Sequence, residues 1–511
     1  MTEAEADRLG ERLQGGHVVV FPFPASGHIA PFIPFARSLA RYGVAITFVC
    51  PKHELSKVMR SLVEDESFDA RENVKLETFE VPIEGGLDMA SFDDLKHIMY
   101  ENVEKFDKMM GKLMGVSRMI EYPSHCNGGA PVCIISDMFL GFTQGTAEKF
   151  NIVRYCLFAS PVHFLSLVLH LPKFNAEGLI PSRRGASPLM IPNFPPIPPG
   201  DLPPSQLGDT DNPGSHHFLL NEAHQLWKAG GLLVNSVGEL ERSIIEGLQR
   251  YIIENSRSDK PPRIWTVGPL VEGLGEGKLT LRQKLRETSE EGECFDWLNK
   301  QPDSSVLYIC FGTVAMVSDE QIRQMAIAIE NSGQRFFWVL RIPKDEIGKP
   351  VSEDFSQVFP EGFLERTKAR GLVYLDWAPQ LHILAHRAVR GFVSHCGWNS
   401  TIESISVGVP MIAWPYQAEQ MMNATLLDQL LGVAIRINKT GGWRDMITSE
   451  TFERAIRTLM AEPAGDAMKA KVLQISELIE KAVRPGGSSR TNLESFVQEV
   501  RMLSPGARHS K

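Results

Sequence analysis

Short apolar runs of β character alternate with longer amphipathic stretches along almost the whole chain of 511 residues. In the first half these runs occupy residues 17–23, 45–50, 74–81, 132–137, 153–159 and 232–236. Strands separated by helix-length segments are typical of βαβ units, in which helices cover both faces of a parallel sheet. The alternation therefore predicts an α/β protein with a doubly wound sheet.

A polar stretch, 255–262, interrupts the alternation of apolar runs and amphipathic stretches, which then continues to residue 438. The later runs lie at 263–269, 305–312, 336–341, 371–379, 391–397, 410–415 and 433–438. A chain of 57.0 kDa is too long for one ordinary core, so we expect two Rossmann-like domains in tandem. The expected organisation is a polar tail over 1–16, domains over 17–258 and 259–475, and a C-terminal helical segment over 476–511.

Composition narrows the possible partners and compartment. The net charge of -9 disfavours a nucleic-acid partner, because binding a phosphate backbone requires clustered Lys and Arg. The acidic start of the chain is unlike a secretory signal, and no run reaches the roughly 18 apolar residues that would span a bilayer. The seven cysteines are odd in number and scattered, which suits a reducing compartment. We therefore expect a cytoplasmic monomer.

The stretch 391–410 places many polar groups at one strand end. Between the expected strand and the following helix stand His395, Gly397, Trp398, Asn399 and Ser400. Free N–H groups and the dipole at a helix amino end favour an anion. A structural interpretation is also open, because Ser400 and Glu403 have the S-x-x-E spacing of a capping box for a helix that begins at Ser400.

Residues 377–420 carry a family resemblance. They read WAPQLHILAHRAVRGFVSHCGWNSTIESISVGVPMIAWPYQAEQ, which resembles the donor-binding signature of plant secondary-product UDP-sugar glycosyltransferases, family 1. Other stretches resemble family landmarks: FPFPASGHIAP (21–31), LLVNSVGELE (232–241), WTVGPL (265–270), ICFGTVA (309–315) and GGSSRTNLESF (486–496). The resemblance covers most of the chain and implies the GT-B fold, two Rossmann-like domains that face each other across a cleft.

The resemblance also implies how the nucleoside of a donor is held. Trp377 would stack on uracil, while the backbone around Ala378 and the side chain of Gln380 would meet the edge of the base. Glu403 would accept hydrogen bonds from both ribose hydroxyls, a role that suits a carboxylate.

Further residues are implied for the diphosphate. His395, Asn399, Ser400 and the backbone of Gly397 would hold it, and Thr313 would add a hydroxyl from a neighbouring strand end. Because the helix amino end and a histidine can stabilise a leaving diphosphate, no metal and no cofactor are expected beyond the co-substrate itself.

For the sugar, the resemblance implies contacts from Trp398, Glu419 and Gln420, with Gly27 and Tyr416 completing the donor set. In this family a tryptophan at the first of these positions and a terminal glutamine accompany UDP-glucose, so glucose is the expected sugar.

Two departures from the family pattern stand inside the signature. Arg387 replaces a common proline, which we expect to change only a surface helix. Tyr416 and Gln417 replace a more usual apolar–aromatic pair, and this change lies near the sugar and the acceptor. It bears on the choice of donor and on the shape of the acceptor.

His28 is the candidate general base. An imidazole has an ordinary pKa of about 6.5, and a carboxylate on its second nitrogen would fix its tautomer. In a doubly wound sheet of order 3-2-1-4-5 the fourth strand lies beside the first, so Asp137, at the end of 132–137, should lie near His28, which follows 17–23. The family resemblance assigns this pair the same roles. Without it, a structural histidine and a capping aspartate would be the simpler interpretation.

Two polar patterns in the first half have simpler interpretations than catalysis. The prolines of 191–208, seven of the 33 in the chain, predict a semi-rigid loop that either lines a pocket or packs on the surface. Asp209 and Asp211 form the D-x-D pattern that holds metal and UDP-sugar in another glycosyltransferase fold. They follow the proline-rich loop rather than a strand, so a solvated turn is expected.

Two patterns in the second half also resemble reactive sites. His395 and Cys396 invite a Cys/His nucleophile, but neighbouring strand residues point to opposite faces, so Cys396 is expected in the core. His382 and His386 have the i, i+4 spacing of zinc ligands on a helix. They lack a third ligand, and a surface helix is the expected outcome.

The acceptor should bind in the first domain around His28. Four aromatic residues are candidate walls for a flat aglycone, although any of them could be ordinary core: Phe23, Phe139, Phe142 and Phe194.

The sequence thus predicts inverting transfer of glucose from UDP-glucose to a small lipophilic acceptor, such as the phenolic hydroxyl of a flavonoid. Another UDP-sugar, or transfer to carbon or nitrogen, stays open. The rivals from other classes are a non-catalytic UDP-sugar binder and an NAD-type dehydrogenase, and the second is disfavoured because the βα turns at 24–28 and 312–315 lack G-x-G-x-x-G.

Overall fold

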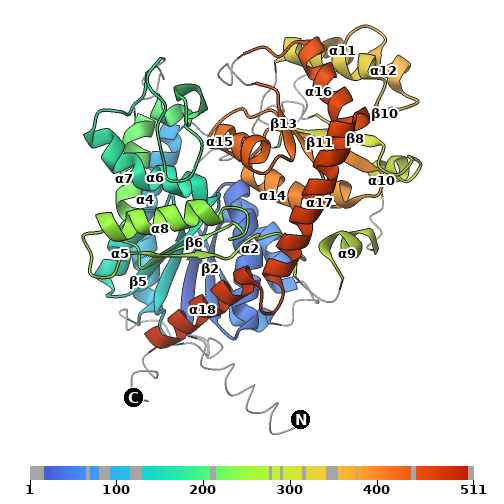
Figure 1. Ribbon diagram of the computed structural model, residues 1–511. Helices are drawn as coiled ribbons and strands as arrows, with labels where there is room; N and C mark the ends of the chain where they lie inside the picture. Colours follow the sequence, from blue (N-terminus) through green and yellow to red (C-terminus); the bar gives the residue numbers. More distant parts are fainter. Residues whose placement is uncertain are drawn as a thin grey trace.

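Two parallel sheets, each covered by helices, make up the molecule (Figure 1). In the computed structural model the described residues are 16–64, 70–79, 92–115, 129–183, 185–207, 214–275, 279–287, 292–312, 318–340, 355–375, 377–438 and 445–504. Each of the thirteen apolar runs that the sequence analysis singled out overlaps one of the strands β1–β13, and a strand extends beyond its run by at most two residues at its start and, in β2, by one at its end. The expected pair of doubly wound α/β domains is confirmed.

The first sheet has the order β3-β2-β1-β4-β5-β6-β7. Its strands are β1 (His17–Phe21), β2 (Ala45–Pro51), β3 (Val74–Phe79), β4 (Cys133–Asp137), β5 (Val153–Phe158), β6 (Gly231–Val234) and β7 (Arg263–Thr266). Its helices are α2 (Ser26–Arg41), α3 (Leu55–Met59), α4 (Phe92–Leu113), α5 (Thr143–Lys149), α6 (Val162–Ala176), α7 (Gly214–Leu226) and α8 (Arg242–Asn255). The winding reverses between β1 and β4, where Phe21 is in register with Ser136.

The second sheet repeats this winding with the order β10-β9-β8-β11-β12-β13. Its strands are β8 (Val306–Cys310), β9 (Arg335–Val339), β10 (Gly371–Tyr374), β11 (Val389–Ser394), β12 (Met411–Ala413) and β13 (Ala434–Arg436). Its helices are α9 (Leu281–Glu287), α10 (Glu293–Leu298), α11 (Asp319–Ser332), α12 (Phe363–Thr367), α13 (Gln380–Ala385), α14 (Trp398–Ser406), α15 (Gln420–Thr425) and α16 (Ser449–Ala461). Here the winding reverses between β8 and β11.

The last two helices join the halves of the molecule. Helix α17 (Pro463–Val483) packs on α14, and after a tight turn α18 (Ser488–Leu503) packs against β7 of the first sheet (Figure 1). Phe496 of α18 is fully buried there, with its ring centroid 5.0 Å from that of Tyr155. Helix α18 therefore contributes to the core of the first domain.

Strand β7 belongs to the first sheet, whereas the expected domain boundary would place it in the second domain. It pairs in parallel with β6, although a boundary after residue 258 would assign it to the second domain. The polar stretch 255–262 is a connection between α8 and β7, and the crossing to the second sheet comes after the strand. A polar gap marks a loop equally well inside a domain and between domains, which is why composition misplaced the boundary.

Short single-turn segments complete the described structure. Turns of 3-10 geometry lie at Lys52–Glu54, Arg71–Asn73, Pro199–Asp201, Pro204–Gln206 and Phe355–Val358, and π-helical turns lie at Arg60–Glu64 and Leu426–Leu430. Within the described ranges, the helices are too short or too polar for any of them to cross a membrane.

Candidate active site

The switch point of the first sheet brings His28 and Asp137 together. His28 lies in the first turn of α2, and its Nδ1 is 2.8 Å from Oδ2 of Asp137, the last residue of β4. The carboxylate is fully buried, whereas 24% of the imidazole side chain is exposed. The backbone N–H of Phe139 donates a hydrogen bond to the other carboxylate oxygen (2.9 Å). Held at both oxygens, Asp137 is positioned to keep the imidazole proton on Nδ1.

Two of the four candidate acceptor aromatics form a cluster with the imidazole, their own ring centroids 5.4 Å apart. The ring centroids of Phe23 and Phe139 lie 5.2 Å and 5.3 Å from that of His28. Phe142 instead packs edge-on against other phenyl rings of the core, and Phe194 is buried against a different histidine. The structure thus separates the candidates into two pairs, of which only one lines the histidine.

A buried arginine behind the dyad was missed in the sequence analysis. Arg154 on β5 is 1% exposed, and it donates hydrogen bonds to the hydroxyl of Ser136 (2.8 Å) and the carbonyl of Asp137 (3.2 Å). Burial raises the pKa of nearby Glu222 to about 7, and the positive charge of Arg154 opposes this shift. Glu222 accepts the backbone N–H of Gly141 (2.7 Å) in the loop that follows Asp137. The one signal in the sequence was a charged residue inside an apolar strand, VRYCLFA.

In the second domain, His395 follows β11 at the corresponding switch point. Its ring lies between two glycines: a Cβ on Gly312 or Gly397 would come within 2.6 Å or 2.4 Å of imidazole atoms. Its Nδ1 is buried and has no hydrogen-bond partner among the described residues. Burial lowers the pKa of His395 to about 4, so the ring is neutral at physiological pH. It can offer a hydrogen bond to an anion without carrying a charge of its own.

Helix α14 begins beside this histidine, and it begins earlier than expected. Its N-cap is Gly397 and its first residue is Trp398, with no side chain capping it. The capping-box interpretation of Ser400 and Glu403 is therefore wrong. Because Gly397 already turns the chain, both residues lie inside the helix, and among the described residues no cap side chain accepts from the N–H groups of its first turn.

The true partners of these two residues come from α13. The amide of Gln380 donates hydrogen bonds to the hydroxyl of Ser400 (3.0 Å) and to Oε2 of Glu403 (2.7 Å). Burial raises the pKa of Glu403 to about 7, and the hydrogen bond from Gln380 opposes the shift. Before α13 stand Trp377, 68% exposed, and Ala378, which is buried. Together they make a polar, partly charged wall next to an exposed aromatic ring.

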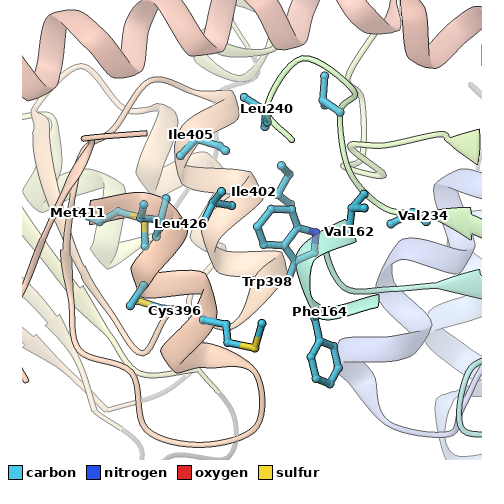
Figure 2. Close-up of a cluster of buried hydrophobic side chains, with 14 of the residues drawn as sticks. Val162, Phe164, Val234, Leu240, Cys396, Trp398, Ile402, Ile405, Met411 and Leu426 are labelled. Atoms are coloured by element: carbon cyan, nitrogen blue, oxygen red, sulfur yellow. The ribbon is translucent and has the colours of Figure 1, made fainter. Parts of the chain in front are cut away.

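Trp398 faces the domain interface with its indole. The side chain is 3% exposed, and Nε1 donates a 2.6 Å hydrogen bond to the backbone carbonyl of Asn235 in the first domain. Figure 2 shows the ring between Val162 of the first domain and Ile402 of α14. What Trp398 can present to a donor is therefore its backbone rather than its indole.

The end of the signature folds back on itself. Oε1 of Gln420, which is 6% exposed, accepts the backbone N–H groups of Tyr416 (2.9 Å) and Gln417 (2.8 Å). Because two N–H groups donate to this atom, it must be the amide oxygen, and the NH2 group of Gln420 points in the opposite direction. Glu419 accepts a hydrogen bond from Ser160 of the first domain (3.2 Å).

One hydrogen bond links the two switch points directly. Nδ2 of Asn399, in the first turn of α14, donates to the backbone carbonyl of Gly27 (2.7 Å). Gly27 precedes His28 in sequence. The amino end of α14 thus lies next to the turn that carries the His28–Asp137 pair.

A buried polar chain across the domain interface was also missed. Nδ1 of His163 is 2.8 Å from Glu241, its Nε2 is 3.0 Å from Oδ1 of Asn423, and the amide of Asn423 donates to the carbonyl of Cys396 (2.9 Å). His163, Glu241 and Asn423 are 0–1% exposed. Isolated polar residues in apolar runs give no sequence signal of the partner that they will meet.

Three further candidates, Thr313, Asp209 and Asp211, lie outside the described residues. His386 contacts Asn299 (3.2 Å), and in the part of the chain that the structure describes no three His, Cys, Asp or Glu side chains gather as a potential metal site.

Comparisons with known proteins place the chain among sugar transferases. A family model described as UDP-glucoronosyl and UDP-glucosyl transferase matches residues 286–509. The chain is similar to UDP-glycosyltransferase 72B1 of Arabidopsis thaliana, with 33% identity over 93% of this chain and 94% of the relative. It is also similar to an anthocyanidin 5,3-O-glucosyltransferase of a Rosa hybrid cultivar, with 30% identity over 95% of this chain and 98% of the relative.

A solved structure agrees with the fold. Phytolacca americana UGT2, complexed with UDP-2fluoro-glucose and pterostilbene, superposes with a TM-score of 0.76 and 27% identity. The match covers 95% of this chain and 99% of that chain. The GT-B arrangement of two parallel-sheet domains is thereby confirmed.

The two tryptophans of the signature should respond differently to truncation. We expect Trp398→Ala to lower the free energy of unfolding by about 3–5 kcal/mol, because it removes a large buried side chain from the domain interface. Trp377→Ala, which alters an exposed ring, should change stability by no more than about 0.5 kcal/mol. Urea denaturation followed by circular dichroism measures both, and equal losses in the two variants would contradict the placement of Trp398.

Proposed function

Because this chain belongs to the plant family 1 UDP-sugar glycosyltransferases, we propose that it transfers glucose from UDP-glucose, with inversion, to a phenolic hydroxyl of a small lipophilic acceptor. That it is an enzyme that transfers a sugar from a UDP-sugar follows from the family. The observation that carries the finer proposal is the His28–Asp137 pair, hydrogen-bonded at 2.8 Å beside the amino end of α14.

In the proposed step, Nε2 of His28 takes the proton of the acceptor hydroxyl while the acceptor oxygen attacks C1 of the sugar. The new C1–O bond forms on the face opposite the bond to UDP, which breaks, so the anomeric configuration inverts. The buried carboxylate of Asp137 stabilises the imidazolium that results. Phe23 and Phe139 pack against the ring and against each other, and they offer apolar surface to a flat acceptor.

The donor is assigned to the switch point of the second domain. The N–H groups of the first turn of α14 and the imidazole of His395 meet the diphosphate, so the negative charge that UDP gains on leaving is stabilised there. Asn399 and Ser400 belong to the same turn, and the backbone of Gly397 leads into it. A neutral His395 is compatible with this role, because a neutral imidazole still has one N–H group that can donate a hydrogen bond to the diphosphate.

The nucleoside and the sugar occupy either side of that turn. Trp377 stacks on uracil, with Ala378 and Gln380 at the base edge, and Glu403 accepts the ribose hydroxyls. For glucose, the NH2 group of Gln420 is the candidate donor, because its oxygen is held by two backbone N–H groups.

The remaining sugar contacts are assigned to Glu419, at the start of α15, and to the backbone N–H of Trp398. A glucosyl donor and a phenolic acceptor are supported by the relatives. One is named an anthocyanidin glucosyltransferase, and one structure contains UDP-2fluoro-glucose and pterostilbene.

Loss of the proposed base should affect turnover and leave donor binding intact. We expect His28→Ala to lower kcat about 10²–10⁴-fold, because the acceptor proton no longer has a positioned base. Asp137→Asn should lower kcat as well, since it weakens the stabilisation of the imidazolium. Product formation from UDP-glucose and a phenolic panel, followed by mass spectrometry and NMR, measures the effect.

His224→Ala is the matched control, because His224 is an exposed histidine on α7 and should behave as the wild type. UDP affinity by calorimetry should stay within about twofold in every variant. Unchanged turnover in His28→Ala would rule out the proposed base. Transfer from UDP-galactose or UDP-glucuronate, offered to the same panel, but not from UDP-glucose would contradict the assignment of the donor.

Donor binding should strengthen as pH rises through 7. The pKa of Glu403, raised to about 7 by burial, means that the side chain is largely protonated at pH 6 and largely ionised at pH 8. Only the carboxylate accepts from both ribose hydroxyls, so we expect the Kd for uridine to fall about tenfold between these pH values. Uridine is used because it has no phosphate that titrates in this range.

Glu403→Gln keeps the shape of the side chain but cannot ionise, so it should remove this pH dependence. Calorimetric titration of both proteins across pH 6–8 tests the assignment. A uridine Kd that varies equally in both proteins would show that another group is responsible.

A further inference from the structure

Helix α15 begins with Gln420, the residue assigned to the donor sugar, and side chains of the first domain hold this helix in place (Figure 1). Ser160 donates a hydrogen bond to Glu419, directly before the helix (3.2 Å), and Nε2 of His163 is 3.0 Å from Oδ1 of Asn423 in its middle. A third contact comes from the proline-rich loop. The part of the second domain assigned to the sugar thus takes its support partly from the domain assigned to the acceptor.

The third contact is an ion pair between Asp201 and Arg436. Asp201 ends the 3-10 turn in the proline-rich loop, and Arg436 ends β13 of the second sheet. Nη1 of Arg436 donates to Oδ2 of Asp201 (2.8 Å), and Nη2 donates to Oδ1 (2.5 Å). The two side chains are 14% and 5% exposed. Two parallel hydrogen bonds fix the plane of the guanidinium as well as its distance from the loop.

The same guanidinium contacts α15. Its Nη1 donates to the hydroxyl of Thr425 (3.0 Å), and its Nη2 is 3.6 Å from Sδ of Met421. Met421 follows Gln420 in sequence and Thr425 is the last residue of the helix, so Arg436 contacts α15 at both ends. The orientation that Asp201 gives to the guanidinium therefore bears on where the whole helix lies.

The loop that carries Asp201 is itself fixed to the first domain on either side of this residue. Nδ2 of Asn193 donates to the carbonyl of Ser243 on α8 (2.7 Å), and the carbonyl of Gln206 accepts the backbone N–H of Ser182 (2.8 Å). Between these anchors the prolines restrict the backbone. The semi-rigid loop that the sequence predicted therefore holds Asp201 at a defined place opposite the second domain.

From these contacts we propose that Asp201 and Arg436 are positioning residues for the donor sugar, acting through α15 on Gln420. The inference rests on the proposed function, in which Gln420 contacts the sugar. The hydrogen bonds of the pair reach α15, whereas uridine and the diphosphate are assigned to α13 and α14. Loss of the pair should therefore weaken the binding of the sugar and spare that of the nucleotide.

The test compares the Kd of UDP with that of UDP-glucose, measured by calorimetry without an acceptor. Asp201→Asn keeps the shape of the side chain but removes its charge and one acceptor oxygen. We expect the Kd for UDP-glucose to rise about tenfold, the equivalent of roughly one hydrogen bond, and the Kd for UDP to stay within about twofold. Asp303→Asn is the matched control and should change neither Kd, because it removes the carboxylate that pairs with an exposed arginine, Arg387, inside the second domain.

Arg436→Gln removes the same pair from the side of the second domain, and it should also weaken UDP-glucose selectively. The double variant Asp201→Asn/Arg436→Gln should bind UDP-glucose no more weakly than Arg436→Gln alone, because one pair can be lost only once. Additive losses in the double variant would overturn the proposal. Unchanged UDP-glucose binding in Asp201→Asn, or an equal loss of UDP and UDP-glucose, which would show a role in folding alone, would overturn it as well.

Gln420→Glu separates this inference from the proposed function. The substitution keeps an oxygen for the backbone N–H groups of Tyr416 and Gln417 but loses the NH2 group assigned to the sugar. If Gln420→Glu weakens UDP-glucose and Asp201→Asn does not, this inference alone is wrong. If UDP-glucose binds Gln420→Glu as it binds the wild type, the assignment of the sugar is wrong and this inference falls with it.

Discussion

The arrangement of the two domains depends on a chain of buried hydrogen bonds centred on His163. Its Nδ1 meets Glu241 within the first domain, and its Nε2 meets Asn423, whose amide in turn donates to the carbonyl of Cys396 in the second domain. The last of these hydrogen bonds, to Cys396, lies directly before the first turn of α14. It therefore sets where the amino end of that helix lies relative to the turn that carries His28, and the link from Asn399 to Gly27 is made only in that arrangement.

These buried hydrogen bonds favour one arrangement of the domains, because leaving a buried polar group without a hydrogen bond raises the free energy of the folded state. Glu241 is 1% exposed, and although burial alone would raise its pKa, hydrogen bonds from His163, Ser236 and the backbone N–H of Val162 keep the pKa below the ordinary value. If the domains shifted, the bond between Nε2 of His163 and Oδ1 of Asn423 would break, and each of these two buried atoms would be left without a hydrogen bond, at about 1–3 kcal/mol for each group. Apolar contacts around Trp398 tolerate small shifts, whereas these hydrogen bonds do not.

The strands and their order could be predicted from the alternation of apolar and amphipathic stretches. Features that depend on a contact between two individual residues could not. Alternating runs located all the strands, and the winding they imply brought Asp137 beside His28. Capping was misjudged at Ser400 because S-x-x-E spacing is also satisfied inside a helix, and the glycine before Trp398 had already turned the chain. The direction of the Trp398 indole, and the partners of Arg154, follow from tertiary contacts that no local pattern encodes.

The two domains place a histidine at the same kind of strand end and give it opposite electrostatic settings. His28 is partly exposed and has the buried carboxylate of Asp137 on its Nδ1. His395 is enclosed between two glycines, no carboxylate of the described residues pairs with its ring, and burial lowers its pKa to about 4. In the proposed function the first setting is that of the base and the second that of a neutral donor to the diphosphate, so the two roles would differ only in what surrounds the same side chain. In this view the glycines at 312 and 397 are as necessary as the imidazole, because a single added Cβ at either position would displace it.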